Sequence, residues 1–147
     1  MLYKKLFLSC LLFSMAQIHC SRVRSSALHG MQQVSVGQNI IYFKKEIRGR
    51  NYEGLSISTD GNLCNGPSQE TDYFVNSETI GKVFYKVVDN RLQIYSQNEF
   101  TPPQAGNFPV LIVQEYNSPI DYNEENAIKL GYTQLLLPDA LLKTCHK

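Results

Sequence analysis

The segment 82–97 constrains the fold of this chain more than any other stretch, because the alternation of its side chains defines a hairpin and its register. Asp89 and Asn90 both tolerate a left-handed backbone, so they predict a two-residue turn between two strands. Val88 then faces Arg91 across the hairpin. One face carries Val83, Tyr85, Val87, Leu92 and Ile94, and the other carries Lys82, Phe84, Lys86, Arg91, Gln93, Tyr95 and Gln97. If the two strands paired with a shift of one residue, lysine and glutamine side chains would enter the core. The pairing set by the turn is therefore also the one that buries the apolar face.

Much of the chain after residue 34 also predicts strands. Segment 39–45 is rich in β-branched and aromatic residues, and segment 55–59 alternates with a period of two before Asp60-Gly61, a dipeptide typical of tight hairpin turns. The continuous apolar run 109–113 is typical of a central strand buried on both faces. Segment 132–137 predicts a further strand. The pattern therefore indicates a fold dominated by β-structure.

A single short helix is predicted over residues 123–130. Asn123 is suited to cap it, Glu124 and Glu125 favour the positive end of the helix dipole, and Gly131 follows the last turn. Helix and strands together predict an α+β fold, dominated by a small antiparallel sheet of about five to seven strands. An all-β sandwich or barrel is the alternative.

The amino terminus has the pattern of a secretory signal peptide. Two lysines precede the apolar run 6–15, which is ten residues long. That is about half the length that crosses a bilayer, and it suits the apolar region of a signal peptide. The small residue Ala16 predicts cleavage before Gln17, and cleavage after Cys20 is the alternative.

The mature chain is predicted to be one domain with a leader. Residues 17–33 are polar and basic, and we expect them to be flexible, whereas residues 34–147 form a single globular domain. Acylation of Cys20 would make the protein a membrane-anchored lipoprotein, although the residues before this cysteine are not small.

The cysteine count of an exported chain predicts one disulfide. Cys10 leaves with the signal peptide, so three cysteines remain. Pairing of Cys64 with Cys145 is the simplest solution, with Cys20 removed, acylated or left as a thiol in the leader. The alternative for Cys145 is a reactive pair with His146, which an oxidising compartment disfavours.

The face of the hairpin that combines aromatic and basic side chains is the strongest candidate for a binding site. Phe84 and Tyr95 form a cross-strand aromatic pair, with Lys86 and Arg91 beside it, and such surfaces hold apolar or acidic parts of a protein partner. The alternative is that the predicted helix at 123–130 covers this face. Substitution of Phe84 separates the two, because only a covering role makes the residue essential for stability.

Positive charge gathers near the start of the domain. Residues 20–50 have a net charge of +5, and a basic patch is predicted at Lys44, Lys45, Arg48 and Arg50. This patch could attract lipid headgroups or an acidic protein, or it could be a solvated strand end. The formal net charge of the whole chain is only +1, so nucleic acid is not an expected partner.

Sequence motifs of the common enzyme classes, of metal sites and of cofactor sites are missing, although a hydrolase that uses two carboxylates needs no motif. Asp60, Glu70, Asp72 or Glu78 could serve such a reaction.

We therefore expect a small exported, non-enzymatic protein without cofactor or metal, acting in the periplasm or outside the cell. It would bind a partner protein as an inhibitor, immunity-type or envelope accessory protein. The alternatives are a carboxylate-dependent hydrolase of envelope polymers and a structural lipoprotein anchored through Cys20.

Overall fold

The hairpin at the centre of the sequence forms as predicted in the computed structural model, which describes residues 27–116, 122–137 and 142–145. Strand β5 (Phe84–Val88) pairs with β6 (Arg91–Ser96) in the predicted register, with Val88 opposite Arg91 and Phe84 opposite Tyr95. The turn residues Asp89 and Asn90 have φ values of 49° and 59°. Local turn chemistry and side-chain alternation therefore determine this element.

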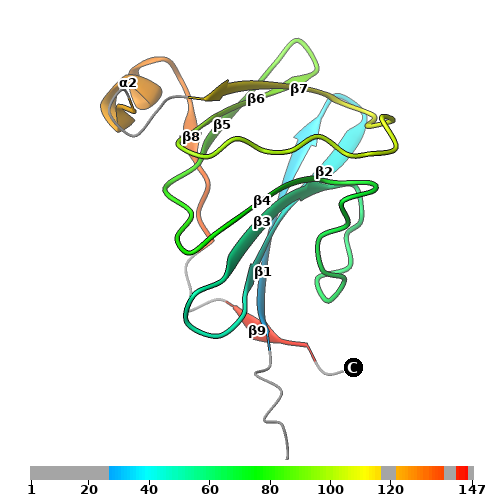
Figure 1. Cartoon of the computed structure of the whole chain (residues 1–147). Helices are drawn as coiled ribbons and strands as arrows, with labels where there is room; N and C mark the ends of the chain where they lie inside the picture. Colours follow the sequence, from blue (N-terminus) through cyan, green and yellow to red (C-terminus); the bar gives the residue numbers. More distant parts are fainter. Residues whose placement is uncertain (1–26, 117–121, 138–141, 146–147) are drawn as a thin grey trace, which may run out of the picture.

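This hairpin is the middle of a four-stranded sheet in the order β7-β6-β5-β8 (Figure 1). Strand β8 (Thr133–Gln134) pairs with β5 antiparallel, and β7 (Leu111–Tyr116) pairs with β6 parallel. The prediction of a central strand at 109–113 is wrong, because β7 is an edge strand and Leu111 is 58% exposed. The strand predicted at 132–137 shortens to the two residues of β8.

The second sheet has five strands in the order β4-β3-β2-β1-β9, and all its neighbours are antiparallel. The strands are β1 (Leu28–Val36), β2 (Asn39–Ile47), β3 (Glu53–Ser58), β4 (Tyr73–Ser77) and β9 (Lys143–Thr144). The flexible leader predicted to end at residue 33 is therefore too long, since residues 28–33 belong to β1. Nine pairs of residues join β1 to β2, so the tertiary pairing outweighs the polar character of this segment.

The two sheets face each other across one apolar core, which confirms a β-dominated fold with a short helix (Figure 1). Each sheet contributes one face of alternating side chains, and the loop residues Phe100 and Val110 complete the core. The largest fully buried apolar residues are Phe43, Phe84, Phe100, Ile41, Ile57, Leu92, Ile94 and Val36. The described part of the chain has no helix with the length and apolar character that a membrane crossing requires.

The helix α2 (Glu124–Lys129) begins and ends as the sequence predicts. The side chain of Asn123 accepts a hydrogen bond from the backbone N–H of Asn126 at 3.1 Å. Gly131 follows the helix with a φ of +82°, a conformation that glycine adopts without strain. In Figure 1 the helix lies at one end of the four-stranded sheet.

The predicted disulfide between Cys64 and Cys145 is present, with a Cα–Cα distance of 5.4 Å. It joins the connection between β3 and β4 to the carboxyl-terminal segment beside β9. The connection includes Asp60 near its start, and the side chain of this residue accepts a hydrogen bond from the backbone N–H of Asn62. Asp60-Gly61 is thus the start of a long connection and not the tight hairpin turn that the sequence predicts.

Candidate functional site

The aromatic pair predicted as a binding surface is covered by α2. Phe84 is fully buried and Tyr95 is 5% exposed, and both pack against Ala127 of the helix and against Tyr132. The ring of Tyr122 stacks on Tyr95 with 5.2 Å between the centroids. The covering role therefore holds for Phe84 and Tyr95, and neither ring is open to a partner.

The two basic residues of the same predicted site, Lys86 and Arg91, are not covered by α2 as the two rings are. Lys86 donates a hydrogen bond to the carbonyl of Leu130 at 3.2 Å, and its ammonium lies 4.3 Å from the centre of the Tyr132 ring. The cation–π contact and the hydrogen bond assign Lys86 a role in holding the end of α2. Arg91 is exposed at the hairpin turn. The structure does not bring the four predicted residues together as one accessible surface.

The tyrosines under α2 resist ionisation. Burial, followed by the negative charge of Glu115, raises the pKa of Tyr132 to about 12. Burial, followed by the charge of Glu124, raises the pKa of Tyr122 as well. Both phenols are therefore neutral in the folded protein at any pH where the unfolded chain would begin to ionise them.

A loss of stability at high pH follows from these tyrosines. Below pH 10 the phenol of Tyr132 is protonated in both states, so its contribution to stability is constant. As the pH rises from 10 towards 12, only the unfolded chain ionises, and the free energy of unfolding falls. Chemical denaturation at a series of pH values will show this decline, and Tyr132→Phe will make it shallower. An unchanged decline in that variant would contradict the assignment.

The predicted basic patch is divided among ion pairs with acidic residues of neighbouring strands and loops. Lys44 is buried and pairs with Asp60 at 3.2 Å. Lys45 pairs with Glu53 at 2.7 Å, and Arg48 pairs with the buried Glu46 at 2.8 Å.

These charges do not form one surface, because Lys44 and Lys45 point to opposite faces of β2. The partner of Lys44, Asp60, has a pKa below its usual value, chiefly because the backbone N–H of Asn62 donates to the carboxylate. Arg50 is exposed. Three of the four residues of the predicted basic patch are therefore in ion pairs, and the fourth, Arg50, is exposed to solvent.

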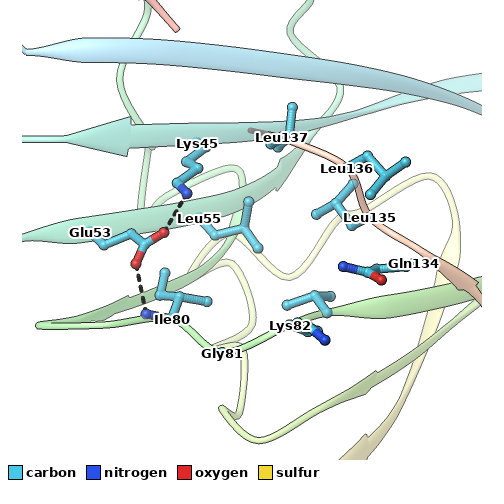
Figure 2. Close-up of a pocket in the computed structure, with 11 residues that line it drawn as sticks. Lys45, Glu53, Leu55, Ile80, Gly81, Lys82, Gln134, Leu135, Leu136 and Leu137 are labelled. Atoms are coloured by element: carbon cyan, nitrogen blue, oxygen red, sulfur yellow. Dashed lines mark hydrogen bonds and ion pairs between the residues drawn. The ribbon is translucent and has the colours of Figure 1, made fainter. Parts of the chain in front are cut away.

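A pocket of about 370 Å³ opens between the two sheets. We call it the intersheet pocket. Its lining comes from Lys45 of β2, from Glu53 and Leu55 of β3, and from the segments 80–83 and 134–137 (Figure 2). This site has no signal in the sequence, because the segments that form it are spread along the chain and share no motif.

The apolar part of the pocket is built on the core. Leu55 and Val83 are buried at its floor, and Ile80, Leu135 and Leu137 pack against the same core cluster. Figure 2 shows the side chains of Leu55, Ile80, Leu135 and Leu137 around a central space. The pocket therefore offers a ligand a mainly aliphatic environment.

Hydrogen bonds hold the wall of the pocket in place. The backbone N–H of Leu135 donates to the carbonyl of Val83 at 2.8 Å, and that of Leu136 donates to the side-chain oxygen of Gln32 at 3.1 Å. Gln32 in turn donates to the hydroxyl of Tyr85 at 3.0 Å. The segment 134–137 is thus tied to both sheets, so the pocket is formed before any ligand enters.

The polar groups of the pocket lie at its edge. Lys45 Nζ and Glu53 Oε1 form an ion pair at 2.7 Å, and the backbone N–H of Ile80 donates to Glu53 Oε2 at 2.8 Å. The amide of Gln134 lies across the space from this pair (Figure 2). The ammonium of Lys82 instead pairs with Glu124 of α2 at 2.6 Å.

A second pocket of about 270 Å³ contains one of the four carboxylates considered for a hydrolase. Asp72 and Glu99 both line it, together with Phe74 of β4. Asp72 is buried and accepts hydrogen bonds from the backbone N–H of Ser68 and the hydroxyl of Thr71. These bonds assign Asp72 a structural role in the connection before β4.

Two predictions concern sites for metals and lipids. Among the residues described, no group of three or more histidine, cysteine, aspartate or glutamate side chains is placed to hold a metal ion. Cys20 and the predicted signal peptide lie outside the described residues, so acylation and cleavage stay predictions. Comparisons of the chain with protein-family models, with curated proteins and with solved structures found no match.

Proposed function

We propose that this protein acts by binding without catalysis, and that its ligand is a small amphipathic molecule held in the intersheet pocket. The observation that carries the proposal is the preformed aliphatic space between the sheets, with few polar groups at its edge. Such spaces are the usual binding sites for small ligands, and about 300–1,000 Å³ is their typical range. At about 370 Å³, the pocket is suited to a ligand at the small end of that range.

We place this function outside the cytosol. The apolar run 6–15 after two lysines supports export, and the Cys64–Cys145 disulfide is compatible with an oxidising compartment. The intact mass of the natively produced protein tests the placement. We expect a chain that begins at Gln17 and is lighter by the two hydrogens of one disulfide. A mass that retains residues 1–16 and two free thiols would contradict it.

Octan-1-ol is a suitable probe, since it has an aliphatic tail and one uncharged polar group. Its titration into isotopically labelled protein is expected to move the amide and methyl resonances of Leu55, Val83 and Leu135 and to saturate at one molecule per chain. These residues line the pocket floor and wall. Resonance changes spread over the surface without saturation would contradict a defined site.

A pocket-filling variant makes the test specific. Ile80→Trp places a larger apolar side chain in the pocket, and we expect it to weaken octan-1-ol binding by about tenfold or more through steric exclusion. Leu130→Trp is the matched control, because Leu130 is 58% exposed and does not line the pocket. Equal weakening in both variants, or in neither, would contradict binding at this site.

A further inference from the structure

We infer that the ligand of the intersheet pocket is uncharged at its polar end and carries a group that both donates and accepts hydrogen bonds, such as an amide or a hydroxyl. This inference rests on the function proposed above and adds the chemistry of the head group. It follows from the ion pair between Lys45 and Glu53 and from the amide of Gln134, which provide the polar contacts of the pocket.

The ion pair supplies opposite charges side by side. Lys45 and Glu53 are mostly buried, with side chains that are 17% and 16% exposed, and their charged atoms are 2.7 Å apart. Glu53 also accepts the backbone N–H of Ile80, so both of its oxygens have partners in the protein. The pair therefore presents no net charge to the pocket.

The third charged residue of the lining, among the residues that the structure describes, is directed elsewhere. Lys82 belongs to the lining, but its ammonium lies 2.6 Å from Glu124 Oε2, on the helix that covers the opposite face of β5. Within the described lining, a ligand consequently meets a neutral pair on one side and a neutral amide on the other. Figure 2 shows the Lys45–Glu53 pair and Gln134 on opposite sides of the space.

A charged head group is disfavoured at such a site. A carboxylate would approach Glu53 as it approaches Lys45, and an ammonium would approach Lys45 as it approaches Glu53. Each ion would also lose hydration on entering an aliphatic space, without a net opposite charge to compensate. An amide or hydroxyl can accept from an ammonium and donate to a carboxylate, and the amide of Gln134 offers the same two functions.

Three probes with the same tail test the inference on the unmodified protein at pH 7. Octanamide is neutral, octanoate is an anion and octylammonium is a cation, and the resonances of Leu55, Val83 and Leu135 report the binding of each. We expect octanamide to bind about tenfold more tightly than either ion. Equal or tighter binding of either ion overturns the inference while leaving the proposed function intact. Failure of octanamide and octan-1-ol to bind overturns both.

A charge variant tests the cause of the preference. Glu53→Gln removes one negative charge from beside Lys45, so we expect octanoate binding to strengthen relative to octanamide by about tenfold. Lys82→Gln is the control, and we expect it to leave the order of the three probes unchanged because that ammonium points to Glu124. A reordering in Lys82→Gln and not in Glu53→Gln overturns the assignment. If Glu53→Gln does not fold, the three-probe series on the unmodified protein decides.

Discussion

Replacement of Phe84 by alanine is expected to lower the free energy of unfolding by about 3–5 kcal/mol. The side chain of Phe84 is fully buried between β5 and α2, where it packs with Tyr95, Ala127 and Tyr132. Removal of the ring leaves a cavity that the rigid sheet cannot close. The loss of the ring also weakens the packing of α2 against the sheet. Chemical denaturation followed by circular dichroism measures the loss.

The matched control lies on the same face of the same strand. Val88 is 37% exposed at the hairpin turn, so Val88→Ala is expected to change the free energy of unfolding by only about 0.5 kcal/mol. A stable Phe84→Ala protein, unfolding at the same denaturant concentration as the unmodified chain, would show that α2 does not cover this ring. The aromatic pair would then be open to a partner.

Loss of the disulfide is expected to have a comparable effect. Cys64 and Cys145 are separated by 81 positions, and closure of a loop of that length contributes about 4–5 kcal/mol in the chain-entropy model, with about 2–5 kcal/mol typical of measured losses. The bond also holds the short strand β9 beside β1, where only two residue pairs form. The double variant Cys64→Ala, Cys145→Ala, followed by guanidinium denaturation, measures this contribution.

Reduction of the unmodified protein provides the control for that variant. A reducing agent should lower its denaturation midpoint to that of the double variant and should leave the double variant unchanged. Equal midpoints for the oxidised protein and the double variant would mean that the bond contributes nothing to stability. The strand β9 would then have to be held by its own pairing.

The parts of the fold that could be predicted from the sequence are those with local causes. The turn at Asp89-Asn90 needs two residues that accept positive φ, and the cap at Asn123 needs one side chain within three residues of its donor. The disulfide followed from a count of cysteines in a chain that the sequence predicts to be exported. Each of these depends on a few neighbouring residues or on composition alone.

Two of the wrong predictions concern elements whose structure depends on distant partners. Strand β1 contains Gly30 and the polar pair Gln32-Gln33, yet its pairing with β2 includes it in the sheet. The apolar run around Leu111 fits a central strand equally well in sequence, but no strand among the residues described pairs with the other edge of β7. Propensity alone does not distinguish these cases, because the outcome is set by tertiary pairing.

The candidate site could not be predicted for the same reason. The basic residues 44, 45 and 48 form a cluster in sequence, but alternation along β2 separates Lys44 from Lys45. Each of the three basic residues pairs with a different acidic residue, which is Asp60, Glu53 or Glu46. The intersheet pocket brings Lys45 beside segments 80–83 and 134–137, which only the packing of two sheets can do. Sequence patterns locate side chains on a face of a strand, but not the space between two sheets.

The central claim is that the space between the sheets is a ligand site, and intermolecular nuclear Overhauser effects with bound octan-1-ol test it most directly. The methyl groups of Leu55, Val83 and Leu135 surround the pocket. We expect cross-peaks between these methyl groups and the tail of the alcohol in the unmodified protein, and none in Ile80→Trp. Cross-peaks only to exposed residues such as Leu111 or Leu130, with none to the pocket, would contradict the account.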